Sequence, residues 1–220
     1  MIEQKIELIK IGETYLKFDF EFNEENKQRI KQAYLNQISQ SSREVFKNKE
    51  HFKIAIEFEE GSLKTRIIIL GSTLFSIYVG IGKYGSFKAG IREMINDVNW
   101  FSENTIERID DGPNINQNDI IRTEKRTGLT GRLQELYNRI DRFERNVNNM
   151  SNVEIQNELN QIKQEVSNLS AVLPNQDEQV FLGELNDDYS ENLPNPNPRR
   201  VNYLANRYGI RPDDEIEFVE

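Results

Sequence analysis

The chain has no cysteine among its 220 residues, and it has a single histidine, His51. The lack of cysteine excludes disulfides and thiolate metal sites, and it fits a reducing compartment. With one imidazole and no thiolate, a zinc site would need carboxylates to complete it, and such a set suits zinc poorly. A Ser-His-Asp arrangement would have to use His51, and no nucleophile-elbow sequence accompanies it. We therefore interpret His51 as an ordinary surface residue.

Other catalytic motifs are missing as well. Gly82-Lys83 is followed by Tyr84 and has no upstream glycine, so it is not a Walker A phosphate loop. Glu93 and Asp97 are four residues apart, which places both on one face of a helix, but no further ligand converges on them. Most adjacent acid pairs fall in segments that we expect to be flexible, and general acid–base catalysis needs rigid groups. We therefore predict no catalytic residue, no metal site, no cofactor and no enzymatic activity.

Positive charge is also scarce, because 28 Lys and Arg stand against 37 Asp and Glu, for a net charge of −9. The excess of acid is concentrated in residues 173–220, and the rest of the chain is nearly neutral. A neutral body lacks the basic field that binding to a phosphate backbone requires, so we do not expect duplex nucleic acid as a partner. The first residues lack the apolar core of a signal peptide. We expect a cytoplasmic protein that is not secreted, with membrane association left open.

One long uncharged run stands out in a chain that is 30% charged, and it extends for sixteen residues from Ile67 to Gly82. We predict an apolar helix over residues 63–82. Ser72, Ser76 and Gly80 recur every four residues, and such a stripe of small side chains lets a second helix approach closely. The competing interpretation is one or two buried strands, because β-branched and aromatic residues are plentiful in the run.

The same run is shorter than a typical membrane-spanning helix. Sixteen helical residues extend about 24 Å at about 1.5 Å per residue, whereas a bilayer core is about 30 Å thick and needs about 20 apolar residues. We therefore favour a buried or oligomer-packing helix. A membrane-anchored sensor or effector that uses residues 63–82 as its span is kept as an alternative.

The residues before the run favour a small antiparallel sheet with one helix. Residues 5–11 and 14–22 are predicted to be strands around a turn at Gly12, and residues 51–60 alternate apolar and polar side chains in the same way. Residues 24–47 carry apolar side chains at helical spacing. The resulting ββαβ pattern is completed most simply by packing the helix on the apolar face of the sheet.

Three glycines follow the run and precede an amphipathic helix predicted over residues 84–107. Gly80, Gly82 and Gly85 match the G-x-G-x-x-G fingerprint that admits a pyrophosphate at a helix N-terminus. The dinucleotide fold needs further βα units, and the rest of the chain does not offer them. We interpret the glycines as a break between two helices and keep a nucleotide-binding protein as a second alternative. Residues 1–109 form the first predicted domain.

The strongest periodicity lies after a polar segment, residues 110–123, which is predicted to be a linker. Residues 124–173 are predicted to form an antiparallel coiled-coil hairpin, because apolar residues recur at alternating spacings of four and three. The two seams are Leu129, Leu133, Leu136, Ile140, Phe143, Val147 and Met150, and Ile155, Leu159, Ile162, Val166 and Leu169. Ser151 and Glu154 form a predicted capping box, so the chain turns back at Asn148–Asn149.

The remaining residues, 174–220, are predicted to be an acidic, largely disordered tail, because they are rich in Pro, Asn and Asp. Residues 201–210 and 215–220 retain apolar side chains and are predicted to be docking segments that fold on a partner. Packing of these segments on the chain's own body is the alternative.

On the hairpin, Arg139 and its neighbours Arg142 and Arg145 are interpreted as a solvated outer face.

The sequence therefore predicts an α+β protein: a ββαβ unit with an apolar and an amphipathic helix, a helical hairpin and an acidic tail. We expect a non-enzymatic interaction or scaffold subunit that assembles through its apolar helical surfaces in a multi-component complex. Its partners would be other proteins, further copies of itself, or both. The predicted interface residues are Ser72, Ser76, Gly80, Leu133, Leu136, Ile140, Phe143, Leu159, Ile162 and Val166.

Overall fold

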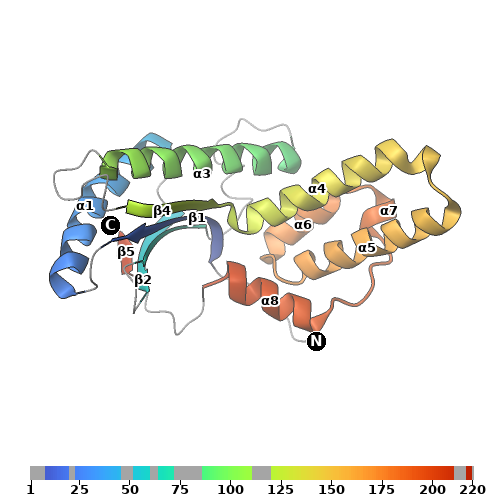
Figure 1. The fold of residues 1–220 in the computed structure, drawn as a ribbon. Coiled ribbons are helices and arrows are strands. Elements are labelled where there is room, and N and C mark those ends of the chain that lie inside the picture. The colour runs from blue at the N-terminus through green and yellow to red at the C-terminus, as the bar shows by residue number, and fades with distance from the viewer. Residues whose placement is uncertain are drawn as a thin grey trace. The chain divides into compact units, whose positions relative to one another are not determined.

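The computed structural model describes residues 8–19, 23–45, 52–59, 64–71, 86–110, 120–210 and 217–219 (Figure 1). The chain splits into two compact units, each assembled from separate stretches. The sheet unit takes Lys10–Gly71, Glu93–Gly128 and Pro212–Glu220, and the helical unit takes Met1–Ile9, Ser72–Arg92 and Leu129–Arg211. Both units draw on residues from either side of the expected linker.

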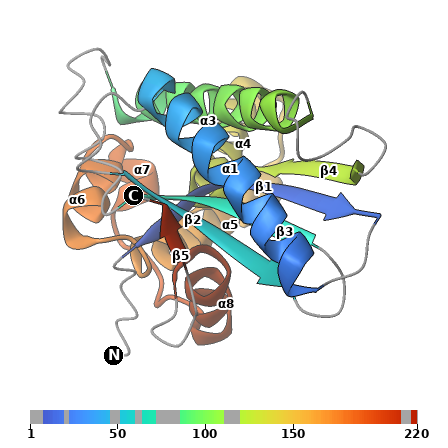
Figure 2. The ribbon, with the colours of Figure 1, turned by 90° about the vertical axis from the view of Figure 1, so that its left-hand side faces the viewer.

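The sheet unit is built on a five-stranded sheet, within the described residues, with the strand order β4-β1-β3-β2-β5 (Figure 2). Neighbouring strands run antiparallel in the pairs β1–β4, β2–β3 and β2–β5. The strands are β1 (Ile9–Phe18), β2 (Phe52–Glu59), β3 (Lys64–Gly71), β4 (Ile120–Arg126) and β5 (Glu217–Val219). Together with the helices they confirm the expected mixed α+β class.

Two long helices accompany the sheet, α1 (Glu24–Val45) and α3 (Phe87–Asp110) (Figures 1 and 2). The side chain of Asn23 caps α1 by accepting a hydrogen bond from the N–H of Asn26 at 2.8 Å, and Ser86 caps α3 in the same way. α3 buries one stripe of residues at spacings of three and four, which confirms the predicted amphipathic helix. This stripe consists of Phe87, Ile91, Met94, Val98 and Phe101.

β3 corrects the prediction for the apolar run. Ile67 to Leu70 are four consecutive residues with 0% exposure, and because successive side chains of a strand point to opposite faces, both faces of β3 are covered. Such a central strand reads as a continuous apolar run, which is also the signature of a buried helix. The helix predicted over 63–82 is therefore wrong for residues 64–71, and the competing strand interpretation is correct there. Residues 72–85, with Ser72, Ser76 and Gly80, lie outside the described residues.

β1 corrects a second prediction, because it runs unbroken through Gly12 where the sequence predicted a turn between two strands. A Cβ atom on Gly12 would lie 2.2 Å from Cγ1 of Val98 on α3, so glycine at this position permits close packing of strand and helix. Two residues further along the strand, the Thr14 hydroxyl donates a buried hydrogen bond of 2.7 Å to Ser102 on the same helix. The glycine therefore marks a helix contact in the strand interior.

The end of the expected linker 110–123 also needs correction, because residues 120–123 belong to β4. β4 lies at the edge of the sheet, pairs with β1, and consists mostly of charged residues. Charged side chains are common on edge strands, where they hinder pairing with other chains. Such a strand lacks the alternating apolar pattern by which half-buried strands are predicted, so β4 was not predicted from the sequence.

The helical unit contains α4 (Gly128–Asn146), α5 (Asn152–Ser170) and three shorter helices. A short 3₁₀ turn, Val147–Asn149, connects α4 to α5, as the predicted register break requires. The predicted capping box is confirmed, because the Ser151 hydroxyl accepts from the N–H of Glu154 while the Glu154 carboxylate accepts from the N–H of Ser151 at 2.8 Å. α5 packs more closely on the three shorter helices than on α4, so we describe α4 and α5 as a hairpin and not as a coiled coil.

The expected disorder of residues 174–220 is wrong over 174–210, where the shorter helices lie. They are α6 (Asn175–Gly183), α7 (Asp187–Ser190) and α8 (Pro198–Tyr208). The buried apolar side chains of this segment are Phe181, Leu185, Tyr189, Val201 and Leu204, whereas Tyr203 on α8 is 52% exposed. Most of the docking segment 201–210 lies in α8, and the second docking segment, 215–220, supplies β5, which pairs with β2. The alternative, in which the tail packs on the chain's own body, describes these residues correctly.

The contact at Gly12 gives the first testable prediction. Replacing Gly12 by Ala should lower the free energy of unfolding by about 1–3 kcal/mol, because the added methyl group overlaps the Val98 side chain. Gly183→Ala is a matched control, since nothing lies within 4 Å of the Cβ it would add, and its effect should stay within about 0.5 kcal/mol. Chemical denaturation measures both. The loss caused by Gly12→Ala should shrink in a Val98→Ala background, and an undiminished loss would contradict the overlap.

Candidate functional site

Of the residues that the sequence singled out for chemistry, the structure describes only Glu93 and Asp97. His51, Gly82 and Gly85 lie outside the described residues. Glu93 and Asp97 are both on α3, where burial raises the pKa of Asp97 and the negative charge of Glu93 raises it further. Within the described ranges, no group of three or more His, Asp or Glu side chains is placed to hold a metal ion. None of the helices in this part of the chain is long and apolar enough to cross a membrane.

Most of the predicted interface residues of the hairpin are buried inside the helical unit. On α4 these are Leu133, Leu136, Ile140 and Phe143, and on α5 they are Ile162 and Val166. Leu159 is only half-buried. The seams that the sequence revealed are therefore occupied by the chain's own packing, except near the turn.

Burial decreases along the hairpin toward the turn. Beyond Phe143 on α4 and before Ile162 on α5, the apolar side chains are half-buried or exposed, and Val153 is 70% exposed. We call this region, residues 143–161, the turn end of the hairpin. Its half-buried apolar residues are Val147, Met150, Ile155 and Leu159.

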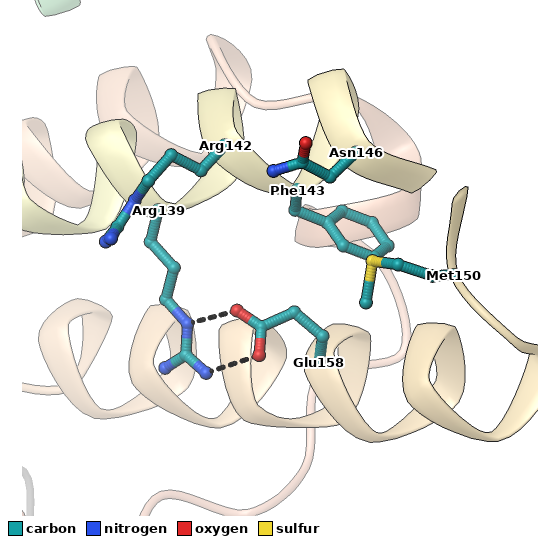
Figure 3. A pocket seen from close by; sticks show the side chains of 6 residues that line it. All are labelled: Arg139, Arg142, Phe143, Asn146, Met150 and Glu158. Atoms are coloured by element: carbon teal, nitrogen blue, oxygen red, sulfur yellow. Dashed lines mark hydrogen bonds and ion pairs between the residues drawn. The ribbon is translucent and has the colours of Figure 1, made fainter. Parts of the chain in front are cut away.

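Two arginine–glutamate pairs hold α4 and α5 together across the gap between them. Arg139 on α4 donates to both carboxylate oxygens of Glu158 on α5, at 2.6 and 2.9 Å (Figure 3). Arg132 donates to Glu165 at 3.0 Å, one heptad further from the turn on both helices. Two pairs in this register establish that the helices run antiparallel. The hydrogen bond from Arg139 lowers the pKa of Glu158, and the bidentate geometry fixes the relative position of the helices.

Glu165 also fixes the last helix of the unit, because the same oxygen accepts a second hydrogen bond of 3.0 Å from Arg200 on α8. Burial alone would raise the pKa of Glu165, but hydrogen bonds and charges from Arg200 and Arg132 outweigh burial and leave the pKa below its usual range. One carboxylate therefore ties α4, α5 and α8 to each other.

The extended segment before α8 is held along α5 by side chain to backbone hydrogen bonds. Lys163 donates to the carbonyl of Glu191 at 2.9 Å, and Ser167 donates to the carbonyl of Pro194 at 2.7 Å. The Asn168 side chain accepts from the N–H of Asn197, which in turn caps α8. These bonds satisfy backbone groups that have no secondary-structure partner, and so they order a segment of composition typical of disorder.

Two open hollows lie side by side on the hairpin. The first has a volume of about 300 Å³ and is lined by Arg139, Arg142, Phe143, Asn146, Met150 and Glu158 (Figure 3). The second, of about 410 Å³, is lined by Glu135, Asn138, Arg142 and Arg145. Arg142 belongs to both. Phe143 and Met150 offer apolar contact in the first hollow, and the arginines that line both hollows offer guanidinium N–H donors.

The role of Arg139 was missed in the sequence, where all three hairpin arginines were interpreted as a solvated face. Arg139 is half-buried and bridges to α5, whereas Arg142 and Arg145 are exposed. A signal for the difference exists, because Arg132 and Arg139 on one helix and Glu158 and Glu165 on the other share a heptad spacing. The role of Arg200 had no such signal, because it depends on where the tail packs.

Glu165 gives the second testable prediction. Because its pKa is lower in the folded chain than the unperturbed 4.5, its stabilising effect is complete above that value and is lost as the pH falls through the lower, folded-state pKa. Glu165→Gln should therefore cost about 1–2 kcal/mol of unfolding free energy at pH 7 and much less near pH 3. Urea unfolding at both pH values measures this, with Glu191→Gln at an exposed position as control. A deficit that is equal at both pH values would contradict the charge-based role.

Comparisons of the chain with protein-family models, with curated proteins and with solved structures gave no match, so the conclusions about function rest on the geometry above.

Proposed function

We propose that this chain is a non-enzymatic interaction subunit that joins a multi-component complex through the turn end of its α4–α5 hairpin. The observation that carries the proposal is the loss of burial toward the turn. Apolar seam residues are fully covered near α6 and α8 but are half-buried or exposed from Val147 to Leu159. A surface of this kind gains free energy when a second surface covers it.

The turn end is also well suited to binding because its shape is fixed in advance. The capping box at Ser151 and the bidentate pair of Arg139 and Glu158 hold both helices at the turn. A contact surface that is already ordered loses less conformational entropy on association than a flexible one. Rigid helices joined by cross-helix pairs therefore support the proposal better than a mobile loop would.

One apolar residue at the turn is of a kind that adapts to a partner, and another is widely exposed. Met150 lines the first hollow, and methionine is a flexible, polarisable side chain common on binding surfaces. Val153 is 70% exposed, and covering apolar area contributes about 25 cal/mol per Å². Of the predicted interface residues on the hairpin, Leu159 therefore stays in the proposed contact surface. The buried seam residues do not, and the surface lies nearer the turn than the sequence predicted.

Both alternatives from the sequence receive less support. The membrane-anchored protein would need a helical span over residues 63–82, and residues 64–71 are strand β3. The nucleotide-binding protein would need phosphate at the N-terminus of α3, as its fingerprint requires. There the carboxylate of Glu184 accepts a hydrogen bond of 2.7 Å from the N–H of Phe87. The chain's own carboxylate thus takes a position that this alternative assigns to a phosphate.

The third testable prediction places a photo-crosslinking amino acid, benzoylphenylalanine, at position 153 of the full chain expressed in its source cells. Illumination should give one discrete adduct, because Val153 lies at the centre of the proposed contact surface and is 70% exposed. The same label at Gln179, an exposed position on α6, is the matched control. Mass spectrometry identifies the adduct as a partner protein or a second copy. Absence of an adduct from position 153, or the same adducts from both positions, would contradict the proposal.

A further inference from the structure

We infer that the two hollows of the hairpin bind an acidic peptide segment of the partner, whose apolar side chain lies against Phe143 and Met150 while its carboxylates meet Arg142 and Arg145. This inference rests on the proposed function, and it adds the chemistry of the partner to it. The observation behind it is an unequal pairing of charges around the hollows.

Each carboxylate near the hollows already has a cationic or hydrogen-bonding partner within the chain. Glu158 accepts both hydrogen bonds of Arg139, and Asp141 pairs with Lys88 at 2.6 Å. Glu135 pairs with Arg132, and Glu144 accepts a hydrogen bond of 3.2 Å from the hydroxyl of Tyr189. Glu158, Asp141 and Glu135 are therefore compensated by cations, whereas Glu144 keeps its negative charge because a tyrosine hydroxyl is neutral.

Arg142 and Arg145 differ from these residues, because neither makes an ion pair with any residue that the structure describes. The Nε of Arg142 donates to the carbonyl of Asn138 at 3.3 Å, and the Nε of Arg145 donates to the carbonyl of Asp141 at 3.0 Å. Both side chains thus lie along α4 and are exposed. A guanidinium presents two forks of N–H donors, and it binds carboxylates in a bidentate manner when they approach. The charge of Arg142 also lowers the pKa of Glu158 from across the first hollow. With Arg142 and Arg145 set against Glu144 alone, the charge left over at the hollows is positive.

The first hollow offers an apolar side chain the half-buried Met150 and the small exposed part of Phe143. Phe143 and Met150 line it together with Arg142, which also borders the second hollow (Figure 3). Its volume of about 300 Å³ is many times the roughly 30 Å³ that a water molecule takes up in the liquid, so one leucine- or phenylalanine-sized side chain can enter. A peptide with an apolar residue next to acidic residues matches this arrangement, in which the apolar side chain enters the first hollow and the carboxylates reach the arginines of the second.

A peptide fits these observations better than a nucleic acid. Nucleic acids need a broad basic field, and this chain carries a net charge of −9 with two arginines at the hollows that make no ion pair with the described residues. The surface thus supplies a small number of charge contacts next to an apolar contact, as recognition of a short acidic segment requires.

The experiment uses the full chain and fluorescein-labelled twelve-residue peptides in an anisotropy titration. A peptide of four Glu-Glu-Leu repeats should bind, and its affinity should fall as salt rises. Peptides of Glu-Glu-Ser and Ser-Ser-Leu repeats test the acidic and the apolar parts separately, and each should bind at least about tenfold more weakly. A twelve-nucleotide oligothymidylate tests the nucleic-acid interpretation. Binding of oligothymidylate as tight as that of the Glu-Glu-Leu peptide would overturn the inference, as would equal binding of all three peptides.

Paired variants locate the site. Arg142→Ala with Arg145→Ala should weaken binding of the Glu-Glu-Leu peptide at least about tenfold, because both guanidinium groups that bind its carboxylates are lost. Arg199→Ala with Arg207→Ala removes the same charge from exposed positions on α8 and should change the affinity less than about twofold. Equal losses in the two variants would show that net charge alone attracts the peptide, and the inference would fail. Thermal unfolding verifies that both variants are folded.

The outcome separates this inference from the proposed function. If the crosslink at position 153 forms in cells but no acidic peptide binds, the chemistry assigned to the partner is wrong while the contact surface stands. If no crosslink forms, the contact surface itself is wrong, whatever the peptides do.

Discussion

The carboxylate of Glu165 accepts hydrogen bonds from two arginines that come from two different helices, one before it and one after it in the chain. A half-buried charge of this kind is tolerated only when its partners are in place, so α4, α5 and α8 must be positioned together. α8 is further secured by the segment 191–197, whose backbone is held by polar side chains of α5. α8 therefore covers the part of the hairpin far from the turn, and Tyr189 of α7 packs on Phe143 and Glu144. The seam residues beyond Phe143 stay partly exposed.

The pair of Arg139 and Glu158 has a different consequence from the pairs of Glu165. Among the described residues, no ion pair joins a shorter helix to the hairpin at Glu158, whereas Arg200 of α8 does so at Glu165. The pair of Arg139 and Glu158 links α4 to α5 through two hydrogen bonds, with Phe143 and Met150 lining the hollow beside it. A surface that combines fixed geometry, apolar contact at Met150 and two arginines without an ion pair is suited to binding a protein segment. The proposed function and the chemistry of the partner both follow from this arrangement.

Periodicity was enough to predict α1, α3, α4 and α5, because each has a long apolar stripe, and the capping box at Ser151 was found from local sequence alone. The strand β3 was missed because a run of isoleucines buried on both sides has no period that distinguishes strand from helix. The helices of residues 174–210 were missed because their order depends on distant partners, such as Arg200 with Glu165. The hollows depend on the same tertiary placement, so the sequence revealed their arginines but not the difference between Arg139 and Arg142.

The central claim is that the turn end of the hairpin is ordered before any partner arrives. Hydrogen exchange of backbone amides in the free chain, followed by mass spectrometry, tests this most directly. The account predicts that amides of α4 beyond Arg139, and of α5 before Leu159, are protected to within about tenfold of those near Leu133 and Val166. Exchange at the rate of an unfolded peptide in the turn end, with protection elsewhere, would contradict the claim.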